Sequence, residues 1–264
     1  MIGFSEKMKL VQDSCPLVHH ITNYVTVNDC ANICICAHGS PVMTDAIEDV
    51  SDMATIASSL VLNIGTLNER TVGSMLLAGS VAKDAGVPVV FDPVGIGATA
   101  YRTSVVERIL DEVRPDIIKG NSGEIGILTG AGGDVRGVDS RSSSDGLADS
   151  MRSWASEHGC ILVSTGVKDL VTDGRRVYEL SNGSVMMETV SGTGCMLSSV
   201  VGVYAGAHGR DTEAMVTAVT MFNVSSEIAA EGAQGPGSFK MNLFDAVYGI
   251  DADTVMKKAK VRML

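Results

Sequence analysis

Four segments of the chain combine glycine with charged, hydroxyl or thiol side chains, and each follows or opens an apolar run. They are Phe91-Asp-Pro-Val-Gly95, Lys119-Gly-Asn-Ser-Gly-Glu124, Val163-Ser-Thr-Gly166 and Val190-Ser-Gly-Thr-Gly-Cys195. Asp92 stands directly after an apolar run and is held by the following proline. A carboxylate in such a place is costly to leave unpaired, so a metal-bound water or another cation is a natural partner. Capping of a turn is the simpler role, and for Asp92 considered alone it is preferred.

The second and third segments offer groups that suit a nucleotide. Lys119 could contact a phosphate, Asn121 adds an amide, and Glu124 could hold Mg²⁺ through water, because Mg²⁺ prefers oxygen ligands and keeps several waters. The Thr165 hydroxyl could donate a hydrogen bond to a phosphate. Taken singly, the two segments are also typical of a capped helix start and of an ordinary turn.

The fourth segment predicts an anion hole. Gly192 and Gly194 allow the backbone to turn its amides inward, and a helix that begins near Cys195 adds about half a positive elementary charge at its N-terminus. Such a site suits a γ-phosphoryl group, whose oxygens carry the charge during transfer. Cys195 itself could be a nucleophile, a metal ligand, a base, or a small residue at the start of a helix.

Short β-branched runs alternate with longer amphipathic runs, a pattern typical of a parallel sheet between helices. The segments in front of the chemical groups therefore become strands whose carboxyl ends meet at one edge, where ligands bind. The predicted strands are Leu17–Ile21, Leu60–Ile64, Val87–Asp92, Asp116–Lys119 and Cys160–Ser164. The predicted helices are Asn23–Ala37, one that opens with the capping box Thr66-Leu-Asn-Glu69 and ends near Ala85, and Ser142–Glu157.

After residue 164 the pattern changes. Asp173-Gly174 suits a two-residue hairpin turn between Asp169–Thr172 and Arg176–Ser181, which predicts a few antiparallel edge strands. The helices Met196–Ala207 and Asp211–Glu231 should then cover the sheet. The stretch 130–145 is rich in glycine and serine and is expected to be a surface loop, so residues 1–264 are expected to form a single domain.

Composition excludes several classes of protein. The chain has 264 residues, 45% of them hydrophobic, and a net charge of −11, so it lacks the basic surface that DNA or RNA binding requires. No apolar run approaches the length of a membrane span. The six cysteines are expected to be reduced thiols in the cytoplasm, with no disulfide framework. Small molecules, without a nucleic acid or a membrane, are the expected partners.

Two other motifs match known binding sites only in part. The run Gly95-Ile-Gly97-Ala-Thr-Ala100 fits a dinucleotide fingerprint, but Asp92-Pro93 precedes it and no acidic residue ends a strand about 20 positions later. Cys30, Cys34 and Cys36 do not have the spacing of a zinc site and are expected to be packed as small hydrophobic residues.

Eight ordered motifs along nearly the whole chain resemble the hydroxyethylthiazole kinases, thiamine-salvage members of the ribokinase-like superfamily. The motifs are His-x-Ile-Thr-Asn-Tyr-Val (from His19 or His20), Asn28-Asp-Cys-Ala-Asn32, Ser40-Pro-Val-Met43, Leu62-Asn-Ile-Gly-Thr66, Asp92-Pro-Val-Gly95, Gly120-Asn-x-x-Glu124, Gly192-Thr-Gly-Cys195 and Gly235-Pro-Gly-Ser-Phe239.

The resemblance implies phosphorylation of the hydroxyl of 4-methyl-5-(2-hydroxyethyl)thiazole by ATP and Mg²⁺, giving the thiazole phosphate used to make thiamine phosphate. It implies a ribokinase-like α/β fold without a lid, and a homotrimer with active sites between subunits. It assigns Asn23, Met43 and Gly194 to the substrate, Asp92 and Glu124 to the Mg²⁺–phosphate region, and Lys119 and Thr165 to ATP.

Lys119 and Cys195 each differ from the residue common in related sequences. The family usually has arginine where this chain has Lys119, so a bidentate phosphate contact becomes a contact with a point charge. Superfamily relatives commonly carry aspartate at the position of Cys195, where it can accept the proton of the substrate hydroxyl. A helix N-terminus can lower the pKa of a thiol, whereas a nearby phosphate and an apolar pocket raise it. We expect Cys195 to be a weak base or an orienting group, and neither a covalent nucleophile nor a metal ligand.

Two rival functions stay open at this point. A kinase of another small alcohol, such as a sugar or the pyrimidine half of thiamine, would share the fold, but a sugar needs several polar groups where Met43 and Val42 are apolar. A nucleotide-sensing or scaffold protein would have lost catalysis, and the presence of Asp92 and Glu124 disfavours it.

Overall fold

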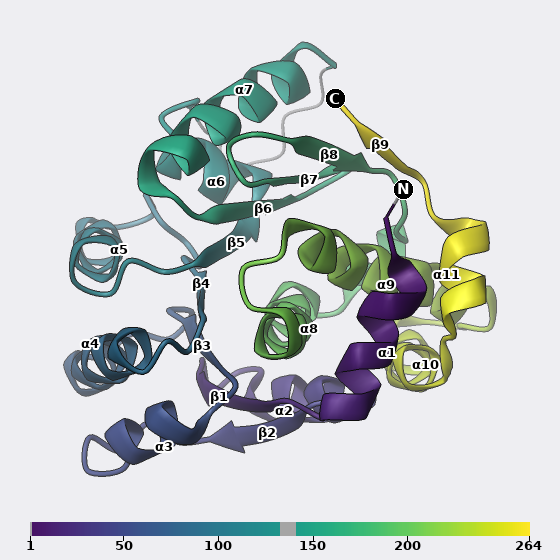
Figure 1. Ribbon diagram of the computed structural model, residues 1–264. Helices are drawn as coiled ribbons and strands as arrows, with labels where there is room; N and C mark the ends of the chain where they lie inside the picture. Colours follow the sequence, from purple (N-terminus) through teal and green to yellow (C-terminus); the bar gives the residue numbers. More distant parts are fainter. Residues whose placement is uncertain (1, 133–140) are drawn as a thin grey trace.

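The computed structural model of the protein describes residues 2–132 and 141–264, and its strands form one nine-stranded sheet in the order β2-β1-β3-β4-β5-β6-β7-β8-β9 (Figure 1). The strands are β1 (Leu17–Ile21), β2 (Ser40–Met43), β3 (Ser59–Asn63), β4 (Val89–Asp92), β5 (Ile117–Asn121), β6 (Ile161–Thr165), β7 (Asp169–Thr172), β8 (Val177–Leu180) and β9 (Val261–Met263). All nine belong to this sheet, so none of the described strands forms a separate lid.

The helices connect these strands. They are α1 (Phe4–Ser14), α2 (Val27–Cys36), α3 (Val50–Ile56), α4 (Glu69–Asp84), α5 (Ala100–Glu112), α6 (Ser122–Leu128), α7 (Arg141–His158), α8 (Thr193–His208), α9 (Thr212–Glu231), α10 (Pro236–Gly249) and α11 (Ala252–Lys258), with a 3₁₀ turn at Val185–Thr189. No helix in the described residues is long and apolar enough to cross a membrane.

Strands β2 to β6 in the sheet order run parallel, and β7, β8 and β9 extend the sheet with antiparallel pairs. The predicted α/β class with antiparallel edge strands is therefore confirmed. The register pairs Asn63 with Asp92, and Asn121 with Thr165. Polar residues at the ends of neighbouring strands are thus brought level with one another at one edge of the sheet.

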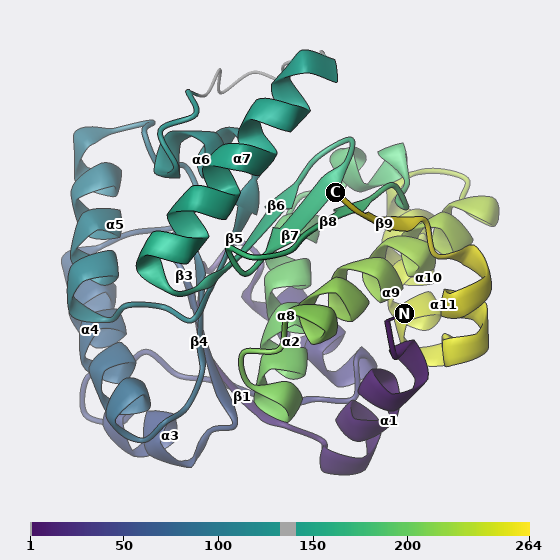
Figure 2. The ribbon, with the colours of Figure 1, turned by 45° about the horizontal axis from the view of Figure 1, so that its top comes forward.

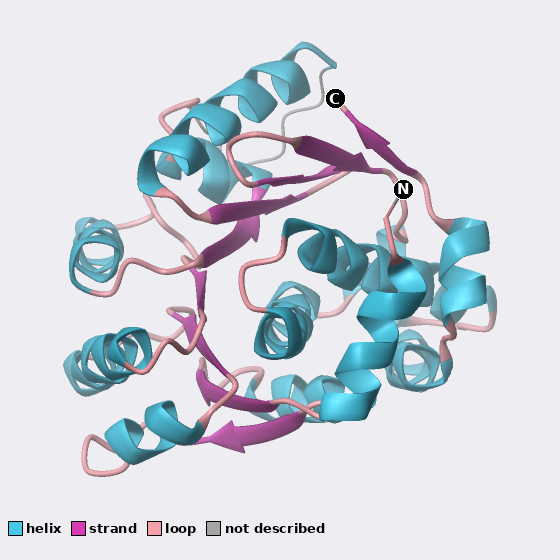
Figure 3. Cartoon of the chain, viewed as in Figure 1, coloured by secondary structure: helices cyan, strands magenta, loops and turns pink. Residues whose placement is uncertain are grey.

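Helices cover both faces of the sheet, which curls around α8 (Figure 3). On the inner face, α8 and α9 pack with α1, α2, α10 and α11 against side chains such as Val18, Val61 and Val90. On the outer face, α3, α4, α5, α6 and α7 pack against the alternate side chains of the same strands, such as Leu60 and Leu62 (Figure 2). Because both faces are covered, the central strands are apolar without alternation, as β3 shows.

Several predicted boundaries were wrong for local reasons. Helix α2 begins at Val27 and not at Asn23, because the Asn23 side chain accepts hydrogen bonds from the backbone N–H and the hydroxyl of Thr26 and so forms a turn. The capping box of α4 consists of Asn68 and Thr71, two residues beyond the predicted one. Hydrogen bonds of this kind depend on the actual turn, which spacing alone does not reveal.

Further differences concern the second half of the chain. The hairpin between β7 and β8 has a loop of four residues, not two, because Thr172 pairs with Val177. The Asp173 carboxylate stabilises this loop by accepting hydrogen bonds from the backbone amides of Arg175 and Arg176. Helix α8 begins at Thr193, before Cys195. Of the predicted loop over 130–145, residues 133–140 lie outside the described part, and α7 already begins at Arg141.

Candidate active site

Polar side chains from three parallel strand ends meet at the N-terminus of helix α8. Asn23 follows β1, Asn63 ends β3 and Asp92 ends β4, and all three are buried. The Asn23 amide donates to Asn63 Oδ1 at 3.0 Å, and the Asn63 amide donates to Asp92 Oδ2 at 3.1 Å. Asn23 and Asp92 therefore lie at the same place, with Asn63 between them.

The sulfur of Cys195 accepts hydrogen bonds from the same two side-chain amides. Its Sγ atom lies 3.3 Å from Nδ2 of Asn23 and 3.3 Å from Nδ2 of Asn63, both of which donate to it. Burial and the neighbouring Asp92 charge raise the pKa of the thiol, although Lys119 and the Asn63 hydrogen bond oppose that rise. Burial and the Asp92 charge therefore favour the neutral thiol over the thiolate.

Lys119 is enclosed beneath the first turn of α8. Its ammonium donates to the Gly194 carbonyl at 3.0 Å and lies 3.6 Å from Asp92 Oδ2, and the residue is 3% exposed. Burial lowers the pKa of the ammonium, but the Asp92 and Glu124 carboxylates raise it by more, so the net pKa lies above its ordinary value. A fixed positive charge thus stands behind the predicted anion hole.

The backbone of the anion hole depends on Gly192. This residue is the N-cap of α8 with a φ of 92°, and a Cβ atom there would lie 2.3 Å from Cγ2 of Thr26. Both the left-handed conformation and the close approach require glycine. The first amides of a helix lack intrahelical acceptors, so those of Thr193, Gly194 and Cys195 are available to an anion.

Glu124 and Asn121 form the start of α6 and are tied to the segment after β4. Asn121 Oδ1 accepts from the Glu124 amide, and Glu124 Oε2 accepts from the Asn121 amide, both at 2.8 Å. Glu124 Oε1 accepts from the Gly95 amide at 2.8 Å. Burial and the Asp92 charge raise the pKa of Glu124, against the opposing effect of these amides and of Lys119. Both predicted residues therefore have local structural roles as well.

Thr165 lies at the end of β6, beside the Gly120 carbonyl at 3.4 Å. The next residue, Gly166, donates its amide to the buried Asp169 carboxylate at 2.9 Å. Asn223 of α9 donates to the other oxygen of Asp169 at 2.5 Å. The turn after Thr165 is thereby held in place from two sides, by β7 and by α9.

Met43 stands apart from this hydrogen-bond network. It ends the edge strand β2, paired with His20 of β1, and is partly buried. The structure therefore brings together Asn23, Asp92, Lys119, Gly194 and Cys195, and places Met43 one strand beyond them.

Three residues of this region had no predicted role. Asn63 ends the buried apolar strand β3 as Asp92 ends β4, but the strand predicted over Leu60–Ile64 placed it inside. Ser198 donates to Asp92 Oδ2 at 2.6 Å from within the apolar run of α8, where nothing marks it. The Arg102 guanidinium donates to the carbonyls of Ile64, Gly65 and Val94, and so holds the segments after β3 and β4 together.

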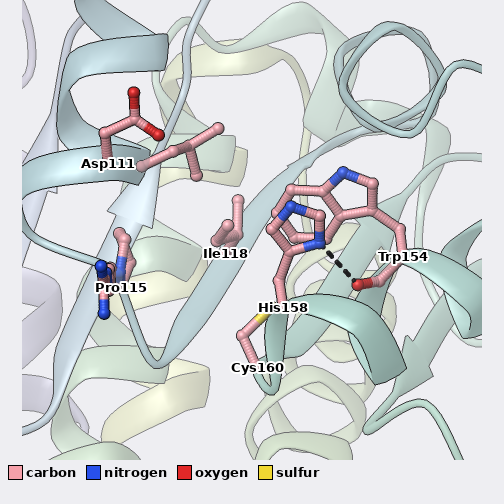
Figure 4. Close-up of a pocket in the computed structure, with 8 residues that line it drawn as sticks. Asp111, Pro115, Ile118, Trp154, His158 and Cys160 are labelled. Carbon is pink, nitrogen blue, oxygen red and sulfur yellow. Dashed lines mark hydrogen bonds between the residues drawn. The ribbon is translucent and has the colours of Figure 1, made fainter.

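A separate cavity of about 450 Å³ opens between α5 and α7, at the amino ends of β5 and β6 and so at the opposite end of these strands from the site (Figure 4). Its lining includes Trp154 and His158, whose rings stack with centroids 3.7 Å apart. Ile118 and Cys160 lie in its wall at the starts of β5 and β6. None of the predicted site residues lines this cavity, so it is distinct from the strand-end site.

Comparisons with known proteins agree on one family. The sequence profile of the hydroxyethylthiazole kinase family matches residues 8–253. A hydroxyethylthiazole kinase of Methanocorpusculum labreanum is 47% identical over 261 residues, covering 99% of this chain and 98% of that protein. One of Thermoanaerobacter pseudethanolicus is 45% identical, covering 97% of this chain and 98% of the other.

Solved structures point the same way. The hydroxyethylthiazole kinase of Pyrococcus horikoshii superposes with a TM-score of 0.92 at 36% identity, and each chain is covered completely. The pyridoxal kinase of Staphylococcus aureus, in complex with AMP-PCP and pyridoxal, has a TM-score of 0.66 at 15% identity, covering 94% of this chain and 99% of that one. This second likeness concerns the fold alone.

Proposed function

Because this chain belongs to the hydroxyethylthiazole kinase family, we propose that it transfers the γ-phosphoryl group of ATP to the hydroxyl of 4-methyl-5-(2-hydroxyethyl)thiazole. The product is the thiazole phosphate used to make thiamine phosphate. The observation that carries this proposal is the placement of Cys195, Asp92 and Lys119 around the N-terminus of α8. A helix N-terminus with glycines, backed by a buried ammonium, is suited to the charge of a phosphoryl group in transfer.

In this proposal the protein accelerates the reaction mainly by aligning the reacting groups and stabilising their charge. Phosphoryl transfer passes through a loose transition state, so charge stabilisation and alignment matter more than a strong base. The amides of Thr193, Gly194 and Cys195 stabilise the phosphoryl oxygens, and Gly194 also lies beside the substrate. Two asparagine amides hold the Cys195 sulfur as acceptor, which leaves its S–H to orient the substrate hydroxyl.

The residues present fit the proposed Mg²⁺ and ATP. Among the described residues no group of three or more His, Cys, Asp or Glu side chains could hold a metal. Mg²⁺ commonly binds through one or two carboxylates together with waters and phosphates, and Asp92 and Glu124 provide such a pair. Since both Glu124 oxygens already accept backbone hydrogen bonds, its contact would run through water. Bound Mg²⁺ would neutralise phosphate charge, while Asn121 and Thr165 would hold ATP. Lys119, predicted to contact ATP, is enclosed against the Gly194 carbonyl and would act on the phosphates through its charge.

We also infer a homotrimer with active sites between subunits, as the family resemblance implies. Asn23 is followed by two large exposed side chains, Tyr24 at 77% and Val25 at 62% exposure. A subunit interface at the site would cover these exposed apolar side chains. Met43, which stands apart from the network within one chain, would complete the thiazole pocket. The cytoplasmic location expected from the cysteines stays a prediction.

Incubation with Mg-ATP and a panel of alcohols tests the function directly. The panel contains the thiazole alcohol, hydroxymethylpyrimidine, pyridoxal and ribose, and ADP release is measured for each. We expect release that depends on the thiazole alcohol. Release with another member alone would replace the substrate and keep the kinase, whereas ATP binding without turnover on any member would favour a nucleotide-binding scaffold.

A further inference from the structure

Ser198 makes an unusual contact for a serine inside a helix. A helical serine commonly donates to the carbonyl four residues earlier, which here is that of Gly194. That carbonyl oxygen lies 3.3 Å from Ser198 Oγ, whereas Asp92 Oδ2 lies at 2.6 Å. A hydroxyl has one proton, so the shorter bond to the carboxylate takes it. The residue is 1% exposed, and this bond crosses from α8 to the end of β4.

Lys119 contacts the same two acceptors, so that Ser198, Asp92, Lys119 and the Gly194 carbonyl form a ring of polar contacts. Its ammonium donates to the Gly194 carbonyl at 3.0 Å and lies 3.6 Å from Asp92 Oδ2. Two donors, the Ser198 hydroxyl and the Lys119 ammonium, therefore face two acceptors, the Asp92 carboxylate and the Gly194 carbonyl. The ring joins β4, β5 and the first turn of α8, which carries the anion-hole amides.

The ring also decides which carboxylate oxygen of Asp92 is available. Oδ2 accepts from Ser198 and from the Asn63 amide, while no hydrogen bond to Oδ1 is found within residues 2–132 and 141–264. Rotation of the carboxylate would break both bonds. Hydrogen bonds to a charged group are stronger than those between neutral groups, and the Ser198 bond is the shorter of the two, so Ser198 contributes much of this restraint.

We propose that Ser198 is a positioning residue for phosphoryl transfer, which fixes the Asp92 carboxylate relative to the amides of Thr193, Gly194 and Cys195. It acts through Asp92 and does not touch the substrate. This proposal rests on the proposed function, because it is stated for that reaction. Its geometric part, the attachment of α8 to the end of β4 one turn after the anion-hole amides, holds in the protein without any ligand.

Kinetics of three variants test the catalytic part. In Ser198→Ala we expect kcat for the thiazole alcohol to fall about tenfold or more, which corresponds to about 1.4 kcal/mol, with both KM values within about twofold of wild type. Ser198→Cys has nearly the same size and a weaker donor, so its kcat should lie between the two. Ser225→Ala is the control, because it also removes a fully buried helical hydroxyl, but one that donates to Met221 Sδ within α9.

Hydrogen exchange of the ligand-free protein tests the geometric part without relying on activity. The Met196 amide, which donates to the Gly192 carbonyl at 2.8 Å, should exchange about tenfold faster in Ser198→Ala and at the wild-type rate in Ser225→Ala. Wild-type kcat in Ser198→Ala, or a loss that Ser225→Ala shares, would overturn the positioning role, and unchanged exchange would overturn the attachment. If wild type itself does not phosphorylate the thiazole alcohol, the proposed function fails, while the exchange result still decides the attachment.

Discussion

Cys195 shows how a site can contain a thiol without using a thiolate. Its sulfur accepts two asparagine amides, an arrangement that favours negative charge, yet burial and Asp92 raise its pKa. Burial is the larger effect, because a partly enclosed charge loses water that two weak donors to sulfur do not replace. The residue is therefore suited to orienting a hydroxyl, in agreement with a reaction that depends mainly on alignment.

Substitution of Cys195 should therefore be tolerated. Cys195→Asp should keep or increase kcat, because a carboxylate accepts the Asn23 and Asn63 amides better than a sulfur does. Cys195→Ser should lose less than the roughly 100-fold that a positioned general base contributes. Steady-state ADP release measures both, with the exposed Cys15→Ser as the unaffected control. Two inactive but folded variants that still bind ATP would contradict this view.

At the scale of elements, the N-terminus of α8 is set by its N-cap. Gly192 adopts a left-handed conformation, and its Cα faces Thr26 of the segment before α2. The anion-hole amides that follow can point outward only while this turn persists. The helix and its entering turn thus act as one unit.

Gly192→Ala and Gly73→Ala should have opposite effects on stability. Gly192→Ala should lower the free energy of unfolding by about 1–2 kcal/mol from the left-handed backbone alone, with the Thr26 clash in addition. It should also lower kcat. Gly73 lies inside α4 with open space around its Cα, so Gly73→Ala should raise stability by about 0.5–1 kcal/mol and leave kcat unchanged. Denaturant unfolding and kinetics measure both, and equal losses would contradict the role assigned to the turn.

At the scale of the whole molecule, the pH dependence of stability contains a contribution from Asp169. Burial raises the pKa of this carboxyl to about 6, although Gly166, Asn223 and Lys119 oppose the rise. The folded protein then keeps a proton that the unfolded chain has already lost. Because the folded pKa lies above the unfolded one, this contribution to the free energy of unfolding falls as pH rises from about 4 to about 6.

Asp169→Asn should remove that decline. Relative to wild type, the variant should gain on the order of 1–3 kcal/mol as pH rises through this range, at up to about 1.4 kcal/mol per pH unit. Asp251 is the control of opposite sign, because a backbone hydrogen bond from Thr254 lowers its pKa and its contribution is lost as pH falls. Urea unfolding between pH 4 and 7 measures these slopes, and a parallel slope for wild type and Asp169→Asn would exclude the contribution.

Much of the fold and part of the site followed from the sequence. Apolar runs without alternation predicted buried parallel strands, and polar residues behind them predicted a site at the carboxyl edge, because parallel strands all end there. Asp92 and the glycines before Cys195 were found in this way. Helix α2 was predicted too early, because the competing turn at Asn23 depends on side-chain geometry.

Only the tertiary structure decided the contacts between residues that are distant in the chain. Ser198 and Asp92 are 106 positions apart, and the spacing of neither predicts that one donates to the other. Lys119 was expected at a phosphate, and only the packing of α8 against β5 shows its ammonium beneath the Gly194 carbonyl. Sequence periodicity reports the local choice of strand or helix and the face that is buried. The pairing of polar groups across that buried space depends on how the helices settle on the sheet, and this determines which oxygen, sulfur or amide is left for the reaction.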